Sequence, residues 1–206
     1  MHVKRFVSVV QRRIIEGDDN LLRVVEPLFA IETHMSMEER LRLLAVAQGL
    51  PQGFTACEIG SYLGASTTFL AVGASARGGT LHCVDTWDNR AMGVETACDT
   101  YAAFLRNTEP FRDRITIHRG ESSAMAAAVP QLLDLLFIDG DHAYTTVKSD
   151  LVLYLPKLKP GGLLLLHDFD YPEVRQACAE SLAGRPTVDL GLTHTLKAFQ
   201  MLGPQH

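Results

Sequence analysis

Short apolar runs alternate with amphipathic stretches along most of this chain. The apolar runs predict strands, at residues 54–59, 80–85, 114–118, 132–139 and 161–168, followed by two more at 186–190 and 194–202. The stretches between them predict helices, at residues 66–76, 95–107, 122–129, 144–158 and 173–184. Strands that are apolar on both faces and separated by helices are typical of a parallel sheet covered on both sides. We therefore expect an α/β fold with a doubly wound, mostly parallel sheet.

The first 53 residues are predicted to form a helical N-terminal extension, before an α/β domain at residues 54–206. Ser36 and Glu39 have the spacing of a capping box, which starts a helix. Residues 1–15 combine basic and apolar side chains but lack the longer apolar core and the cleavage site of a signal peptide. They predict an amphipathic helix that packs on a partner subunit, so we expect a homo-oligomer.

The composition narrows the classes of partner. The 206 residues are 47% hydrophobic and 21% charged, with a net charge of −5, which is ordinary for a soluble globular protein. An acidic chain gives no electrostatic reason to expect a nucleic acid, and its longest apolar run, residues 163–166, is too short to span a membrane. The four cysteines form no CxxC pair, which favours reduced thiols in a cytoplasmic protein.

Residues that follow the strands are the candidates for chemistry, because ligands of such sheets bind beyond the carboxyl ends of the strands. The first strand leads into EIGSYLGAS, where Gly60 and Gly64 permit a tight turn and close approach of a ligand. The spacing is not GxGxxG, which disfavours a dinucleotide site. A plain strand-to-helix turn is the alternative.

The second and third strands end in polar residues of the kind that bind a nucleoside. Asp85 lies 21 residues after Gly64, where a carboxylate can accept hydrogen bonds from both hydroxyls of a ribose; the alternative is a helix cap. Glu121 or Ser122 could contact an adenine edge, and Ser122 could instead cap the next helix.

The fourth and fifth strands end in carboxylates and imidazoles. LLFIDGDHAY places Asp139 and His142 after the fourth strand, and LLLLHD places His167 and Asp168 after the fifth. Neighbouring parallel strands would bring Asp139 and Asp168 to one rim, where two carboxylates suit Mg²⁺ or Mn²⁺. An imidazole ligand from His167 would shift the preference toward a transition metal. Alternatively, the carboxylates cap helices and His167 packs in the core.

In order and spacing, ExGxxxGxS, VDTW, GES, LLFIDGDHAY and KPGGLLLLHD resemble a class I S-adenosylmethionine-dependent methyltransferase. The resemblance covers about residues 54–170. More specifically, the sequence is similar to methyltransferase family 24 and to the metal-dependent O-methyltransferases of the macrocin and mycinamicin type. It implies a seven-stranded sheet whose last strand is antiparallel. It also implies cofactor contacts from Glu58, Gly60, Ser61, Tyr62, Gly64, Ser66, Asp85, Thr86, Trp87, Glu121, Ser122 and Asp139.

The same resemblance implies the catalytic groups. Asp139 and Asp168, with His167, would bind Mg²⁺ or Mn²⁺, and His142 holds the place of the catalytic base. The family carries two consecutive acidic residues after the fifth strand, whereas this chain has His167 and Asp168. A metal ion lowers the pKa of a bound hydroxyl, and a histidine, which ordinarily titrates at about pH 6.5, can take its proton.

We therefore expect an S-adenosylmethionine-dependent methyltransferase that methylates a hydroxyl of a small molecule, such as a sugar or a natural product. A metal-independent methyltransferase and a non-catalytic protein that binds S-adenosylmethionine are alternatives. An NAD-dependent oxidoreductase is disfavoured, because the sequence contains no GxGxxG motif.

Overall fold

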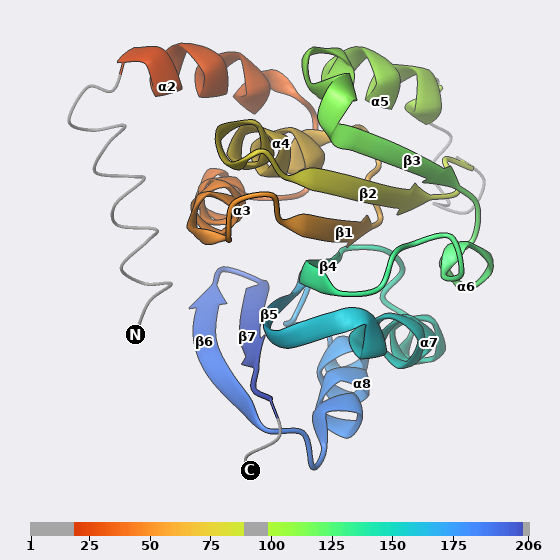
Figure 1. The fold of residues 1–206 in the computed structure, drawn as a ribbon. Helices are drawn as coiled ribbons and strands as arrows, with labels where there is room; N and C mark the ends of the chain where they lie inside the picture. The colour runs from red at the N-terminus through yellow and green to blue at the C-terminus, as the bar shows by residue number, and fades with distance from the viewer. Residues whose placement is uncertain (1–18, 89–98, 204–206) are drawn as a thin grey trace.

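The computed structural model describes residues 19–88 and 99–203. Within them the strands form one seven-stranded sheet in the order β3-β2-β1-β4-β5-β7-β6 (Figure 1). The strands are β1 Thr55–Ile59, β2 Thr80–Asp85, β3 Ile115–Arg119, β4 Leu133–Ile138, β5 Leu158–Leu166, β6 Thr187–Thr193 and β7 Leu196–Met201. Strands β1 to β5 pair in parallel, and β7 is antiparallel to both β5 and β6. The predicted doubly wound sheet with an antiparallel last strand is confirmed.

Helices cover both faces of this sheet, because side chains of a strand point alternately to opposite faces. In β4, Leu135 and Phe137 join one core cluster, whereas Leu136 and Ile138 join the other. The helices are α2 Asp19–Val25, α3 Met37–Gly49, α4 Ala65–Arg77, α5 Thr100–Thr108, α6 Ser122–Met125, α7 Tyr144–Tyr154 and α8 Pro172–Leu182. The first cluster contains residues of α3, α4 and α5, and the second contains residues of α7 and α8 (Figure 1).

Helix α3 is part of the main core. Its capping box forms as expected: the Ser36 hydroxyl accepts from the Glu39 amide, and the Glu39 carboxylate accepts from the Ser36 amide. The Arg42 guanidinium is buried and donates to the carbonyls of Leu190, Gly191 and Leu196 in the β6–β7 hairpin. These hydrogen bonds connect α3 to the β6–β7 hairpin, which is near the C-terminal end of the sequence. The helix predicted at residues 1–15 lies outside the described residues.

Several predicted element bounds change. Helix α5 begins at Thr100, and the part of its predicted range at residues 95–98 lies outside the described residues. Helix α6 is four residues long rather than the eight of the predicted 122–129. Helix α7 ends at Tyr154, just before Pro156, which cannot donate a backbone hydrogen bond to continue it.

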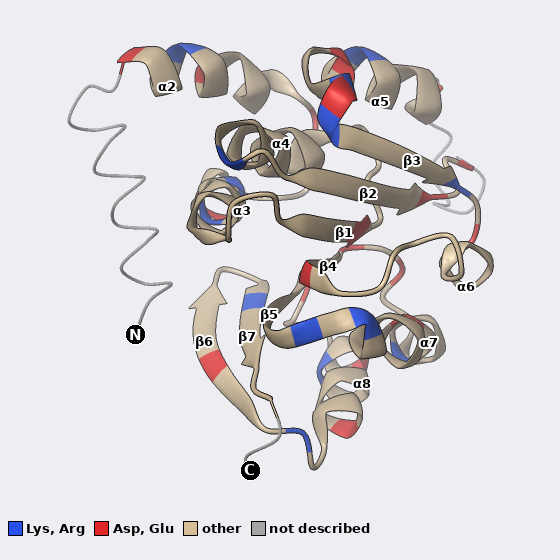
Figure 2. Ribbon diagram, in the orientation of Figure 1, with Lys and Arg blue, Asp and Glu red and all other residues tan. Residues whose placement is uncertain are grey.

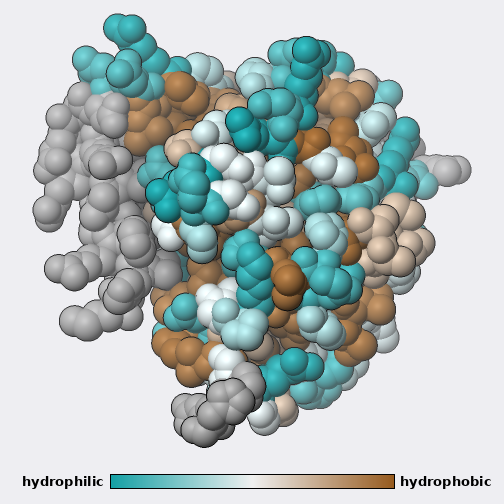
Figure 3. Space-filling model, viewed as in Figure 1, coloured by the Kyte–Doolittle hydropathy of each residue, from teal (hydrophilic) through white to brown (hydrophobic). Residues whose placement is uncertain are grey.

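Hydrophilic and hydrophobic residues are interspersed on the face shown in Figure 3. In the part of the chain that the structure describes, no helix is both long and apolar enough to cross a membrane. The homo-oligomer stays a prediction.

Candidate functional site

The conformation of the turn between β1 and α4 requires glycine. Gly60 has φ +85°, and a Cβ built on it would lie 2.1 Å from the Asp139 carbonyl oxygen. Any side chain at position 60 would therefore collide with the backbone that follows β4. Gly64, also at φ +85°, precedes the first turn of α4. The predicted tight turn thus exists, and it lies directly against the end of β4.

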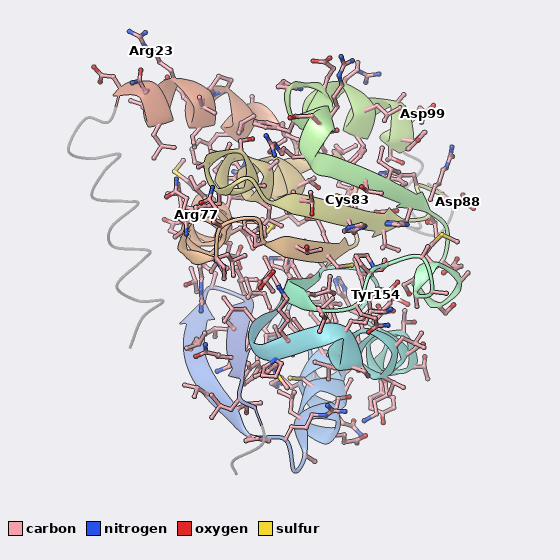
Figure 4. All side chains as sticks on the ribbon, viewed as in Figure 1. Arg23, Arg77, Cys83, Asp88, Asp99 and Tyr154 are labelled. Atoms are coloured by element: carbon pink, nitrogen blue, oxygen red, sulfur yellow. The ribbon has the colours of Figure 1, made fainter. Side chains whose placement is uncertain are left out.

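Glu58 lies beneath this turn at the end of β1. Its side chain is buried, and Oε2 accepts hydrogen bonds from the hydroxyls of Ser61 (2.8 Å) and Thr67. The thiol of Cys83, labelled within β2 in Figure 4, lies 3.6 Å from the same oxygen. Among the described residues Oε1 has no hydrogen-bond partner. Burial raises the pKa of Glu58 to about 7, although the hydroxyl hydrogen bonds oppose the rise.

Asp85, at the end of β2, fixes the turn through backbone amides. Its Oδ2 accepts from the amides of Ser61 and Tyr62, both at 2.8 Å, and Oδ1 accepts from the Trp87 amide at 2.7 Å. Figure 2 shows acidic residues at the carboxyl ends of β1 and β2, where Glu58 and Asp85 lie. The carboxylate predicted for a ribose therefore already organises the loop that the ligand would approach.

The residues predicted for the adenine end are dispersed. Trp87 is buried among Tyr101 and Phe104, and its indole N–H donates to the Tyr62 carbonyl. Its ring therefore has little surface left for a ligand. The Thr86 hydroxyl accepts from the Asp88 amide at 3.2 Å.

Ser122 fastens α6 to α7, and Glu121 is exposed. The Ser122 hydroxyl donates to Asp150, and its carbonyl accepts from the hydroxyl of Tyr154, which Figure 4 labels. Burial raises the pKa of Asp150 to about 6, against the effect of the Ser122 hydrogen bond. These contacts give Ser122 a structural role between the helices.

The rim beyond β4 and β5 brings the predicted carboxylates together. The two strands are parallel neighbours, with Ile138 opposite Leu166. The His167 Nδ1 lies 3.0 Å from Asp139 Oδ1 and 2.9 Å from Asp168 Oδ2. One donor atom of each of the three residues lies within 4.8 Å of the others. Asp168 has φ +51°, a backbone conformation that residues other than glycine rarely adopt.

The charges at this rim are strongly coupled. Burial alone would lower the pKa of His167, but hydrogen bonds to Asp139, Asp168 and Glu39 raise it to about 12 in the metal-free protein. Burial raises the pKa of Asp139 despite its hydrogen bond to His167. The pKa values of Asp168 and Glu39 are lowered, because their hydrogen bonds outweigh the opposing effect of burial. Without a metal, a protonated His167 therefore partly neutralises the carboxylates.

His142 is the most exposed imidazole of the rim. Its Nε2 lies 2.7 Å from Asp168 Oδ2, and its ring stacks on Tyr171 with centroids 4.7 Å apart. Asp141 accepts instead from the Ala143 amide and the Thr146 hydroxyl at the start of α7. The Asp141 side chain is therefore engaged at the start of α7, and it is Asp168 that orients His142.

A cleft of about 350 Å³ joins the turn to the rim. Of the predicted site residues it is lined by Gly60, Ser61, Tyr62, Ser66, Asp139, His142, His167 and Asp168. Glu58, Gly64, Asp85, Thr86, Trp87, Glu121 and Ser122 are outside this lining. The cleft therefore unites about half of the predicted cofactor residues with all of the predicted catalytic and metal residues.

The sequence interpretation missed the part of the site that comes from the N-terminal region. Thr33, His34 and Met35 of this region line the cleft. Tyr171, which follows β5, also lines the cleft and stacks on His142. Glu39 lies behind His167, with Oε1 3.5 Å from Nε2. The capping-box pattern predicted Glu39 at the start of α3, with one carboxylate oxygen bonded to Ser36. The pattern did not indicate that the other oxygen contacts His167.

The donor set at the rim fits a divalent cation. Neighbouring donors around an octahedral ion with bonds of about 2.1 Å are about 3 Å apart, and the His167–Asp139 and His167–Asp168 separations are 3.0 and 2.9 Å. The three side chains reach the cleft, which provides a route of entry. The departure from two acidic residues to His167 and Asp168 therefore preserves a usable set of donors.

Comparison with known sequences assigns the chain to a protein family. A profile described as a methyltransferase domain, family 24, matches residues 57–169, more than half of the chain. The chain belongs to this methyltransferase family. An uncharacterised protein of Sinorhizobium fredii is 27% identical over 146 residues, which are 68% of this chain and 16% of that protein. An uncharacterised protein of Acanthamoeba polyphaga mimivirus is 37% identical over 65 residues, 28% of this chain and 29% of that protein. The chain thus spans less than a third of either relative.

Three solved structures with the same fold are described as O-methyltransferases. The TDP-rhamnose 3'-O-methyltransferase of calicheamicin biosynthesis has a TM-score of 0.63 and 17% identity, over 96% of this chain and 92% of that one. An O-methyltransferase of Bacillus cereus, in complex with S-adenosylhomocysteine, has a TM-score of 0.63 and 20% identity, over 97% and 98%. An O-methyltransferase of tomaymycin synthesis from Streptomyces achromogenes, in complex with S-adenosylmethionine, has a TM-score of 0.63 and 17% identity, over 98% of this chain and 100% of that one. At these identities the likeness shows the fold.

Proposed function

We propose that this methyltransferase domain transfers a methyl group from S-adenosylmethionine to a hydroxyl of a small molecule, with the assistance of a divalent metal. One observation carries the proposal: a single cleft joins the glycine turn after β1 to His142 and the carboxylates after β4 and β5. A methyl donor held on the turn would face a base and two acidic side chains. The complexes of the Bacillus and Streptomyces relatives with the product and the donor support the choice of cofactor.

The turn and its carboxylates would bind the methyl donor. The backbone of Gly60, Ser61 and Tyr62 lines the cleft, and Asp85 holds the last two amides in place. Because Gly60 has no side chain, the backbone of Asp139 packs directly against this turn and brings the end of β4 beside the proposed donor site. The donor already carries an activated methyl group, so the protein has to supply orientation and a suitable electrostatic environment.

The rim would activate the acceptor. With its proton on Nε2 donated to Asp168, His142 leaves Nδ1 to accept a proton from the acceptor hydroxyl. The stacked Tyr171 ring holds the imidazole plane. Asp139, His167 and Asp168 are the residues that would hold a divalent cation, which when bound would lower the pKa of the acceptor hydroxyl.

The acceptor would be a small hydroxylated molecule. A cleft of about 350 Å³ is at the small end of ligand sites. Its lining includes Thr33, His34, Met35 and Tyr171, which combine polar and apolar surface. This mixture suits a sugar or a natural product with several hydroxyl groups. The calicheamicin and tomaymycin relatives support that class of acceptor.

The test combines binding with turnover. Titration calorimetry with S-adenosylmethionine and S-adenosylhomocysteine should show binding, and a panel of hydroxylated acceptors should show turnover that EDTA abolishes. His142→Gln should keep donor binding and lower kcat by about 10²- to 10⁴-fold. His118→Gln, on β3 and outside the cleft, is the matched control and should leave turnover unchanged.

Each result has a distinct consequence. Absence of donor binding would overturn the proposal as a whole. Donor binding with unchanged turnover in His142→Gln would remove the base from the mechanism, and EDTA-resistant turnover would remove the metal. Donor binding without turnover on any acceptor would favour the non-catalytic alternative.

A further inference from the structure

The contact between Glu39 and His167 joins two segments that are far apart in the sequence. Glu39 belongs to α3, whereas His167 follows β5, and both side chains are almost fully buried, at 3% and 4% exposure. Glu39 does not line the cleft, so it cannot touch a substrate there. It meets His167 on the side of the ring that faces away from Asp139 and Asp168. A buried carboxylate in this place needs a reason, because removing a charge from water is costly.

Thr195, in the turn between β6 and β7, links the two residues. Its amide and its hydroxyl both lie 2.9 Å from Glu39 Oε1, and the Leu196 amide lies 3.1 Å from the same oxygen. The Thr195 hydroxyl also lies 3.2 Å from His167 Nε2. Three donors from the hairpin therefore fix this carboxylate oxygen beside the imidazole.

The directions of the hydrogen bonds between Glu39, Thr195 and His167 follow from the number of protons that each side chain carries. A threonine hydroxyl has one proton, and an ionised carboxylate can only accept. The Thr195 proton is therefore used on Glu39, and Thr195 can only accept from His167 Nε2. Nε2 must then carry a hydrogen, which leaves Nδ1 as the nitrogen that can ligate a cation. A histidine that binds a metal usually donates its second N–H in this way to a carboxylate or a neighbouring acceptor.

We propose that Glu39 is a positioning residue of the Asp139–His167–Asp168 centre, and that this centre prefers Mn²⁺ to Mg²⁺. Glu39 and Thr195 hold the His167 ring so that Nδ1 joins the two carboxylates as a donor. One imidazole with two carboxylates suits a transition-metal ion better than Mg²⁺, which prefers an all-oxygen set. The inference rests on the metal-assisted part of the proposed function, and it makes α3 a part of the metal centre.

Direct metal binding tests the inference without any substrate. Mn²⁺ bound to the full chain is measured from the loss of the free-ion electron paramagnetic resonance signal, and Mg²⁺ is measured by competition. Wild type should bind Mn²⁺ at least tenfold more tightly than Mg²⁺. Glu39→Gln should weaken Mn²⁺ binding by about ten- to a hundredfold, the usual effect of losing an outer hydrogen-bond partner.

Two further variants separate positioning from general stability. Ser36→Ala breaks the same capping box but leaves the Glu39 contacts to Thr195 and His167, so its Mn²⁺ affinity should stay within about twofold of wild type. His167→Asp removes the imidazole and gives an all-oxygen donor set, so its preference for Mn²⁺ over Mg²⁺ should fall at least fivefold. A purely structural role of Glu39 predicts equal effects of Glu39→Gln and Ser36→Ala.

The contradicting outcomes are distinct. Wild-type Mn²⁺ affinity in Glu39→Gln, or an equal loss in Ser36→Ala, would overturn the positioning role. An unchanged Mn²⁺ to Mg²⁺ ratio in His167→Asp would overturn the claimed selectivity. If S-adenosylmethionine binds and is turned over while Mn²⁺ does not bind at millimolar concentration, this inference falls and methyl transfer stands. If neither ligand binds, the proposed function falls as well.

Discussion

The two sides of the cleft are built in different ways. The glycine turn is held by backbone amides and by two carboxylates, Glu58 and Asp85, that lie within 30 residues of one another in the sequence. The rim is held mainly by contacts between side chains, which come from α3, the ends of β4 and β5, and the β6–β7 turn. Two backbone amides of the hairpin also donate to Glu39. The turn depends on backbone geometry, and the rim depends on charge pairing between distant segments.

This difference indicates where each side is sensitive to change. A turn made of backbone tolerates few residue types at a position with positive φ, but it needs no distant partner. A cluster of buried charges tolerates modest movement of the backbone, but losing one partner leaves another charge uncompensated. Gly60 and Asp139 are the point where the two sides touch.

The largest expected effect comes from breaking that contact. Gly60→Ala should lower the free energy of unfolding by about 3 kcal/mol or more, because the new Cβ would lie 2.1 Å from the Asp139 carbonyl oxygen. Gly161→Ala is the matched control: it has the same φ of +85° but no atom within 4 Å of the added Cβ. It should cost only the backbone strain, about 1–2 kcal/mol. Denaturant unfolding measures both, and equal losses would mean that the turn can move away from β4.

A smaller effect should appear in the pH dependence of the turn. The folded pKa of Glu58, about 7, is above its ordinary value of 4.5, so the folded state binds a proton more tightly than the unfolded state. The stabilisation by this proton is complete below about pH 4.5 and is lost as the pH rises through about 7. At about 1.4 kcal/mol per pKa unit, the rise from 4.5 to about 7 corresponds to a loss of at most about 3.5 kcal/mol.

Glu58→Gln isolates this contribution. Its unfolding free energy, measured against wild type from pH 4.5 to pH 8, should lack the decrease. Glu38→Gln, at an exposed position in the first turn of α3, is the control and should keep the wild-type slope. A wild-type slope in Glu58→Gln would assign the titration to another buried acid, such as Asp150.

The sequence predicted the fold and the turn well because their determinants are local. Apolar runs and helix periods depend on neighbouring residues, and the positive φ of Gly60 belongs to a strand-to-helix turn that the sequence shows directly. The convergence of Asp139 and Asp168 also followed, since it needs only that the fourth and fifth strands are neighbours. Trp87 was harder, because its burial against Tyr101 and Phe104 is set by the packing of α5.

The N-terminal contribution to the rim could not be predicted in the same way. The contact of Glu39 with Thr195 joins residues 156 positions apart, and it depends on how α3 docks on the hairpin. That docking uses Arg42, whose buried guanidinium donates to hairpin carbonyls. No local period encodes such a contact. Thr33, His34 and Met35 line the cleft for the same reason, because they lead into the docked helix.

The smallest expected effect distinguishes two neighbouring carboxylates at the rim. Asp141→Ala should lower the free energy of unfolding by about 1 kcal/mol, because the start of α7 loses two hydrogen bonds to this side chain. Its kcat on an accepted hydroxyl should stay within about twofold of wild type. Asp168→Asn, measured beside it, should reduce kcat by at least tenfold, because Asp168 holds His142 Nε2 at 2.7 Å. A large kcat loss in Asp141→Ala with unchanged stability would give the orienting role to Asp141 and reduce Asp168 to a metal ligand.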